Sequence, residues 1–481
     1  MNHTPWSQAN QALKESHYEL LCLTATADDT ITATWLNPAD GSQQSLNVPV
    51  IDQHFPSLTP TLLEVAWDER EIHDLFGYLP QGHPDLRPLV RTPRWPEGFF
   101  PLKNASVGPP PWRALEPDNP AVTVQGEGVT IMKVGPSHAG IIESGHFIFS
   151  LIGENVLHLD AHLFQNHRGV EAQLEGLTVS EVAPLISRLC AADTVSHQTN
   201  WALAVESLSD FEASQTLEWR RIVLLESERI LSHLNDLAQI PAGVGFQVAH
   251  QRALAIKEYW QRGLQLIYGH RFLFDTVKPR WAHPGSAEDM IALLDAMVPK
   301  WKTWRALVEG HHGFQDRMEG VGIVQPLDAV HFGAQGVAAR AAGKAFDART
   351  VLPWYRSFDL QPSISLAGDV KARFSVRLNE LDESFRLVEQ ACTLLRQKGN
   401  LLAGNDLTQG ASGRVITLTE SPHGLNVHDV VLNAGHVTRY HVRAGTYRNW
   451  PLLAKTVAGN TVADFPLINK SFELCYSCND R

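Results

Sequence analysis

The sequence predicts an α+β protein in which a small N-terminal α+β domain precedes a larger, mainly helical domain with short β-strands. Two runs near the start, at 30–36 and 45–50, combine alternating polarity with β-branched residues, which is typical of strands. Prolines are dense over 90–120, where neither a regular helix nor a central strand can form. Apolar residues recur at three- and four-residue intervals over 216–240, which predicts a long amphipathic helix.

The proline-rich segment over 90–120 is the predicted linker between domains at 1–89 and 121–481. The first domain closes in a charged stretch at 67–87, which predicts a helix ended by Gly77 and followed by a turn. By its charge alone, this helix is expected to be exposed to solvent.

The second domain begins with a predicted strand at 128–135, and its pattern is mostly helical from 178 to 274. Helices are also expected at 286–310 and 373–398, because apolar and charged residues alternate there with helical spacing. Short strands follow near the end of the chain, at 414–420, 428–433 and 436–444.

Composition limits the class of protein. The chain has 481 residues, 44% of them hydrophobic and 19% charged, which is ordinary for a soluble globular protein of two or three domains. A net charge of -12 argues against non-specific nucleic-acid binding. The start resembles no signal peptide, and no apolar run approaches the roughly 20 residues that span a bilayer. We therefore expect any membrane connection to run through partner subunits.

Two of the five cysteines, Cys475 and Cys478, lie three apart near the end of the sequence. Few, unevenly spaced cysteines indicate a reducing compartment in which thiols stay available. A pair at this spacing is half of a metal site, a redox pair or a coincidence. Terminal residues usually fray, so a paired thiol site here predicts that the tail is tucked into the protein.

A second thiol lies next to other residues of the kinds that bind metals. On a helix, Cys190, Asp193 and His197 would lie on one face, at i, i+3 and i+7. Together with Cys475 and Cys478 they would supply three sulfurs and a carboxylate, with an imidazole behind them. Taken singly, Cys190 is better explained as a small buried apolar residue than as a ligand, and His197 as a core histidine with its hydrogen bonds satisfied.

Several motifs carry a family resemblance over 66–481. One is WDEREIHDLFGYLPQGHPDLR at 67–87, and the others follow in order: GPSHAGIIESGHF, NHRGVE, ESERILSHLNDLA, GDVKARFSVRLNE, TESPHG and YHVRAGTYRNWP. With these motifs the chain resembles the large subunit of membrane-bound, energy-converting nickel-iron hydrogenases of the formate hydrogenlyase and hydrogenase-4 class. These relatives of respiratory complex I, the NADH-quinone oxidoreductase, fuse its 30 kDa and 49 kDa subunits in one chain.

The resemblance implies a nickel site with bridging iron, held by two thiolate pairs. Cys190 matches the first cysteine of the N-terminal pair, and Cys475 and Cys478 match the C-terminal pair. Asp193 stands where the remaining cysteine belongs and, by position, it and Cys478 would be the bridging ligands. A carboxylate is a harder donor than a thiolate, so the exchange is expected to alter metal choice.

Hydrogen chemistry needs a base beside the metal and a route to solvent. The resemblance makes Glu143 and His197 candidates for moving protons and Asp193 a fourth ligand or a proton acceptor. An alternative for Glu143 is a buried ion pair with Arg168. Two further residues are candidate supporting donors, namely Arg414 and His423.

The implied complex has several partners. Iron-sulfur clusters are expected in a separate small subunit, because this chain lacks the cysteines for a four-thiolate cluster in addition to the metal site. Membrane-arm subunits, and formate dehydrogenase or ferredoxin-like electron carriers, complete the expected set, on the cytoplasmic side of the inner membrane. The family is commonly cleaved at the position of Arg481, so the sequence is expected to be either a mature form or one without a tail.

Two alternatives remain open. One is a non-catalytic coupling or scaffold subunit whose pocket is empty or holds a structural ion such as zinc. The other is a quinone-reducing subunit as in complex I. The quinone site of complex I has a histidine in one loop and a tyrosine that contacts the quinone. At the matching positions, this chain has the loop from His138 to Glu143 and Val179.

Overall fold

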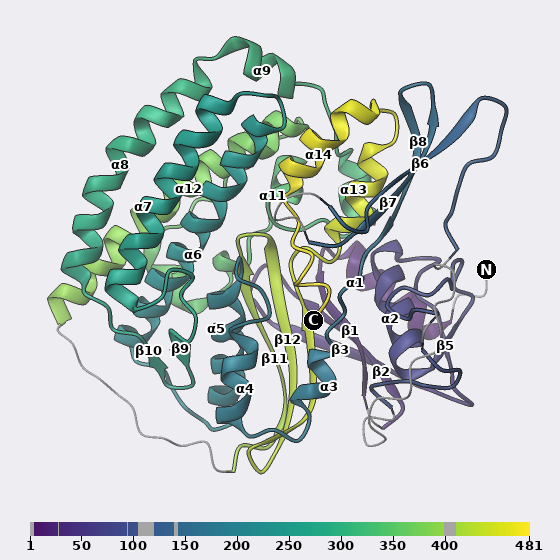
Figure 1. The fold of residues 1–481 in the computed structure, drawn as a ribbon. Helices are drawn as coiled ribbons and strands as arrows, with labels where there is room; N and C mark the ends of the chain where they lie inside the picture. Colours follow the sequence, from purple (N-terminus) through teal and green to yellow (C-terminus); the bar gives the residue numbers. More distant parts are fainter. Residues whose placement is uncertain (1–3, 27, 94, 104–119, 139–142, 399–409) are drawn as a thin grey trace.

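The computed structural model describes residues 4–26, 28–93, 95–103, 120–138, 143–398 and 410–481 (Figure 1). Most of the predicted linker, 104–119, lies outside the described residues, as does 139–142 of the histidine loop. The boundaries of the two domains therefore stay a prediction.

The N-terminal part is a small α+β unit. Its main sheet is antiparallel with the order β1-β2-β3, and two short strands, β4 and β5, pair in parallel. Both strands predicted here are confirmed. The elements are α1 (Pro5–Glu15), β1 (Glu19–Thr26), β2 (Thr30–Leu36), β3 (Gln43–Pro49), β4 (His54–Pro56), α2 (Ala66–Phe76) and β5 (Leu79–Gln81).

Helix α2 ends at Gly77, as predicted, and this glycine adopts the left-handed conformation with a φ of 76°. The expectation that the helix is exposed is wrong. Arg443 pairs with Asp68, and the Tyr447 hydroxyl donates to Glu71, so a later part of the chain covers α2. Four of its acidic side chains are buried, namely Asp68, Glu69, Glu71 and Asp74.

Two antiparallel three-stranded sheets belong to the second part. The predicted strand at 128–135 is β6 of the first sheet, and the three predicted near the end of the sequence form the second. One has the order β6-β7-β8 and the other β11-β12-β13; β9 and β10 form a small hairpin. The strands are β6 (Val129–Val134), β7 (His146–Ile152), β8 (Asn155–His162), β9 (Val277–Lys278), β10 (Trp281–Ala282), β11 (Gly413–Ser421), β12 (Gly424–Asn433) and β13 (His436–Arg443).

Long helices build the rest, and the three predicted helices are confirmed as α6, α8 and α12. Figure 1 shows the long helices side by side, with the N-terminal sheet on the opposite side of the molecule. The helices are α3 (Val170–Leu174), α4 (Val179–Ile186), α5 (Thr194–Ser207), α6 (Gln215–Ala242), α7 (Gln247–Tyr268), α8 (Ala287–Glu309), α9 (His312–Met318), α10 (Pro326–His331), α11 (Gly336–Ala341), α12 (Val370–Lys398), α13 (Asn449–Val457) and α14 (Phe465–Phe472). Short 3₁₀ helices span Leu63–Val65, Ala348–Thr350, Pro353–Phe358 and Val462–Asp464.

Helix α6 is the central helix rather than an amphipathic surface helix. It packs against α12, α7, α5 and α14, so its polar as well as its apolar side chains are buried. Its charged residues must therefore find partners inside the protein.

The tail is tucked in, as predicted. Cys478 and the three residues after it are 1–3% exposed, and Figure 1 shows this end of the chain between the helices and the N-terminal sheet. Among the described residues, no helix is long and apolar enough to cross a membrane.

Candidate metal centre

The two thiol segments meet, but not on the helix face that the sequence predicted. Cys190 lies in the loop between α4 and α5, and Asp193 immediately precedes the first residue of α5. The backbone N–H groups of Val195 and Ser196 donate to the buried Glu228 carboxylate, which fixes the start of α5 after Asp193. The prediction that Cys190 and Asp193 are helical is therefore wrong.

Three sulfur atoms converge at this loop. The Sγ atoms of Cys190 and Cys475 are 3.0 Å apart, although the two residues are 285 positions apart in sequence. With the Sγ of Cys478 they form a group whose atoms all lie within 4.8 Å of one another. Because two sulfurs about 2.3 Å from one ion are at most about 4.6 Å apart, this spacing fits a single thiophilic cation with little movement.

The three thiols differ in acidity. Hydrogen bonds from Cys190 and Cys478 lower the pKa of Cys475 to about 5. The hydrogen bond with Cys475 raises the pKa of Cys190, and burial raises that of Cys478. The hydrogen bonds among the three sulfurs therefore make Cys475 the most acidic of the three thiols.

Asp193 completes the pocket as one half of an ion pair. The Nδ1–H of His423 donates to its Oδ1 at 2.8 Å, and its Oδ2 lies 3.5 Å from the Sγ of Cys478. Burial alone would raise the pKa of Asp193, but the charge and hydrogen bond of His423 lower it. Burial likewise opposes protonation of His423, yet Asp193 raises its pKa to about 9.

The donor set fits one metal ion better than a nickel-iron pair. A pair of soft metals shares thiolates between its two ions, and here one of the four expected sulfurs is replaced by a carboxylate. That carboxylate, from Asp193, already has the imidazolium of His423 as its partner. Three sulfurs with one occupied oxygen beside them suit a single nickel or zinc ion.

Arg168 ties the two halves of the pocket together, and nothing in the sequence pointed to this role. Its Nη2 donates to the carbonyl oxygens of Leu189 at 2.7 Å and Ser477 at 2.8 Å, each of which directly precedes a cysteine of the pocket. Glu143 is exposed and accepts a hydrogen bond from the backbone N–H of Ser477 at 2.8 Å. The alternative of a buried partner for Arg168 is therefore wrong, and Glu143 lies at the rim of the pocket.

His197 lies on α5 within a row of buried rings. Its Nδ1 is 2.9 Å from the Nε2 of His428, whose Nδ1 is 2.7 Å from the Tyr440 hydroxyl. Burial lowers the pKa of His197 to about 4, so the ring is neutral. Arg414 does not support the pocket, because its guanidinium pairs with Asp429 against the N-terminal sheet.

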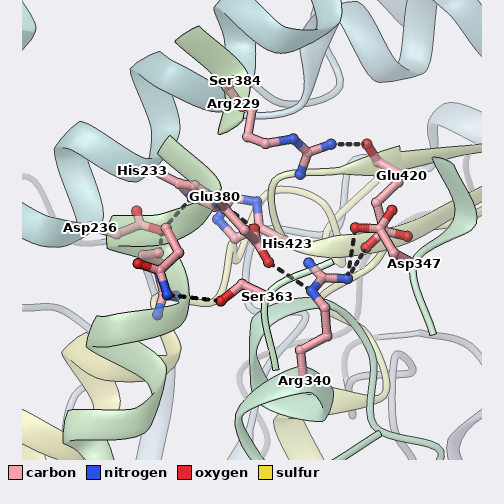
Figure 2. Close-up of polar contacts among 12 residues, drawn as sticks. Arg229, His233, Asp236, Arg340, Asp347, Ser363, Glu380, Ser384, Glu420 and His423 are labelled. Carbon is pink, nitrogen blue, oxygen red and sulfur yellow. Dashed lines mark hydrogen bonds and ion pairs between the residues drawn. The ribbon is translucent and has the colours of Figure 1, made fainter. Parts of the chain in front are cut away.

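A buried ionic network extends between α6, α11, α12 and β11, and Figure 2 draws it together with His423. Arg340 lies at its centre, 2.7 Å from Glu380 and 2.8 Å from Glu420, and Glu380 also lies 2.8 Å from His233. All four side chains are at most 2% exposed. Each of these buried charges has lost its hydration, so the opposite charges of its neighbours must stabilise it.

A cavity of about 540 Å³ lies elsewhere, between the N-terminal part, β8 and α13. Its lining includes His146, His158 and His162 but none of the thiols. This cavity is therefore separate from the thiol pocket.

The His423 ion pair predicts a pH-dependent contribution to stability. The pKa of His423 is raised from 6.5 to about 9, so the contribution is complete below pH 6.5 and is lost as the pH rises through 9. Between pH 6 and 10, the free energy of unfolding of the metal-free chain should fall by on the order of 3 kcal/mol more than that of His423→Gln. Urea unfolding of both proteins across this range measures the difference, and parallel pH profiles would contradict the ion pair.

The sequence and the fold match the large subunits of complex I-type redox complexes. The family model of the respiratory-chain NADH dehydrogenase 49 kDa subunit matches residues 257–411, and that of the 30 kDa subunit matches residues 2–109. A solved structure of the membrane-bound sulfane sulfur reductase, an archaeal respiratory membrane complex, shares the fold with a TM-score of 0.69 and 23% identity. The matched region covers 74% of this chain and 99% of the chain in the solved structure.

Curated relatives include large subunits of hydrogenase complexes. Formate hydrogenlyase subunit 5 of Escherichia coli (strain K12) is 28% identical over 450 residues, which cover 89% of this chain and 77% of the relative. Hydrogenase-4 component G of the same organism is 30% identical over 441 residues, with 89% and 76% covered. The carbon monoxide-induced hydrogenase of Rhodospirillum rubrum is 27% identical over 363 residues, with 72% and 98% covered. The chain belongs to the family of oxidoreductase large subunits that fuse the 30 kDa and 49 kDa domains, which confirms the resemblance.

Proposed function

We propose that this chain is the large subunit of a membrane-bound, ion-translocating redox complex and that its thiol pocket binds one metal ion. Cys190, Cys475 and Cys478 supply three thiolates, and Asp193 lies at the fourth corner. The observation that carries the proposal is the convergence of sulfurs from two distant segments at one largely buried point. Nickel in this pocket would supply redox chemistry toward a small substrate, whereas zinc, which is not redox-active, would only polarise it.

The protein itself supplies the proton chemistry. His423, charged at neutral pH beside Asp193, can give up a proton next to the sulfurs and recover it. Glu143, exposed at the rim, is placed to pass protons to solvent. His197, a neutral and fully buried ring on α5, is with Glu143 our second candidate for moving protons.

Electrons must come from other subunits. Of the five cysteines, three form the pocket, and Cys22 and Cys392 are buried on β1 and α12, so a four-thiolate cluster cannot form in this chain. We propose a small subunit with iron-sulfur clusters and a membrane arm as partners, with formate dehydrogenase or ferredoxin-like carriers as electron donors. The complex would lie on the cytoplasmic side of the inner membrane.

The donor set also favours a second candidate function. Three thiolates closed by the Asp193 carboxylate would give the four ligands of a structural zinc ion, in a subunit that couples others without catalysis. Nickel, iron and zinc analysis of the purified complex, together with an electron-transfer assay, separates the two. Electron transfer that persists without any metal in the pocket would overturn the catalytic proposal.

Replacing Asp193 with cysteine is expected to increase nickel retention. The change restores a fourth soft donor and removes the carboxylate that pairs with His423. Nickel per chain is measured in complexes purified from nickel-supplemented cells, with Asp193→Asn as the matched control because it changes the charge without adding sulfur. Equal nickel in Asp193→Cys and Asp193→Asn would show that more than one ligand has been lost.

A further inference from the structure

Arg481 is a deeply enclosed charged residue of the tail, and it contacts two carboxylates from distant parts of the chain. The residue is 2% exposed. Its Nε donates to Glu171, on α3, at 2.8 Å, and its Nη2 donates to Glu71, on α2 of the N-terminal part. The guanidinium thus joins α2 and α3 through one buried group.

Both carboxylates are held in place by further donors. The Tyr447 hydroxyl donates to the second oxygen of Glu71 at 2.6 Å. Glu171 accepts from the backbone N–H of Val442 at 3.0 Å and lies 3.1 Å from the Nδ1 of His441. Because these donors hold both carboxylates in place, the carboxylates fix the position of Arg481 and, with it, the tail.

The same cluster could be mistaken for a second metal site. Oxygen and nitrogen atoms of Glu71, Glu171 and His441 lie within 4.8 Å of one another and all three residues are buried. However, Arg481 already donates to both carboxylates and supplies the positive charge that a cation would bring. The cluster therefore holds a side chain of the protein itself.

Arg481 lies three residues after Cys478, and the tail between them is held from several sides. The backbone N–H of Arg168 donates to the carbonyl of Asp480 at 2.6 Å, and the N–H groups of Asn479 and Asp480 donate to the carbonyl of Tyr476. This short, turned segment transmits the position of Arg481 to the sulfur of Cys478. Chain ends without such contacts fray.

We propose that Glu71 and Glu171 are positioning residues that hold Cys478 in the thiol pocket by clamping Arg481. Because Glu71 belongs to the N-terminal part, the pocket is complete only when α2 is docked against the tail. This clamp makes the N-terminal part a requirement for the thiol geometry and not only a docking domain. The inference concerns the position of the sulfurs, so it does not depend on which reaction the complex performs.

Cysteine alkylation of the metal-free, full-length chain tests the clamp. Cys478 is 1% exposed, so iodoacetamide should label it slowly in the wild type. Glu71→Gln and Arg481→Met should each raise the labelling rate of Cys478 by at least about tenfold, measured by mass spectrometry of its peptide. Arg481→Lys should fall between them and the wild type, because an ammonium keeps the charge but cannot bridge two carboxylates as a fork does.

Two controls separate a local clamp from general loosening. Glu69→Gln lies on the same helix, but its carboxylate accepts from Ser57, Leu58 and Thr59 rather than from the tail, so Cys478 should stay protected. Cys392 is equally buried on α12 and reports global unfolding in every variant. A rise at Cys478 matched by Cys392 or by Glu69→Gln, or no rise in the clamp variants, would overturn the proposal.

Cadmium binding to the same chains gives an independent readout. Cadmium–thiolate absorption should titrate with an affinity about 10- to 100-fold lower in Glu71→Gln than in the wild type, as is typical when a group that orients a metal ligand is removed. Equal cadmium affinities in the two proteins would contradict a positioning role. If the wild type itself does not bind cadmium, the metal site is contradicted, but the alkylation test of the clamp still stands.

Discussion

Replacing Cys475 with serine is expected to remove the metal from the intact complex and to lower its rate of electron transfer by more than about 100-fold. Removing a group that only orients a metal ligand costs about 10- to 100-fold, and Cys475 is a direct ligand in our proposal. It is also the thiol whose pKa the other two lower to about 5 by hydrogen bonding, so it gives up its proton to a metal more readily than they do. A serine hydroxyl cannot ionise in this range.

The matched control for this variant is Cys392→Ser. Cys392 is also buried, but it lies on α12 and outside the sulfur group, so its loss should leave metal content and electron transfer unchanged. Both complexes are assayed for bound metal and for the oxidation of reduced viologen by the assembled complex. Full activity of Cys475→Ser, in a complex that has lost its metal, would show that the pocket is not the reaction site.

Replacing Arg340 with methionine is expected to lower the free energy of unfolding by about 3–5 kcal/mol. The guanidinium is fully buried and neutralises Glu380 at 2.7 Å and Glu420 at 2.8 Å, with Asp347 at 3.5 Å. Removing one partner of a buried ion pair leaves an uncompensated charge in a poorly solvated site. The network of Figure 2 would therefore lose its central cation.

The urea midpoint of the full-length chain measures this loss, and Arg262→Met is the control. Arg262 also pairs with a carboxylate, that of Glu258 at 2.9 Å, but its side chain is 77% exposed. Exposed pairs contribute about 0–1 kcal/mol, so the midpoint should barely move. Similar shifts in the two variants would mean that the buried network adds nothing beyond an ordinary surface pair.

Local pattern was enough to predict three of the long helices and several of the strands. The helices at 216–240, 286–310 and 373–398 follow from spacing that each segment carries by itself. The burial of α2 could not be predicted in this way, because the groups that cover it, Arg443 and Tyr447, lie about 375 residues away in sequence. A charged helix is exposed by default, and only distant partners reverse that.

The candidate site was predictable in its residue types and not in its geometry. Cys475 and Cys478 signal thiol chemistry by their spacing, and the family motifs point to Cys190. Nothing local shows that Glu228 ends the loop at Asp193, so the helical interpretation of that segment failed. The clamp on Arg481 was equally hidden, since it joins residues 410 positions apart.

X-ray absorption of the intact complex tests the central claim most directly, at the nickel or zinc edge, where iron in partner clusters does not contribute. A single ion in the pocket of Cys190, Cys475 and Cys478 predicts about three sulfur neighbours near 2.3 Å and one lighter ligand. Four sulfur neighbours, or the absence of stoichiometric nickel and zinc, would contradict it.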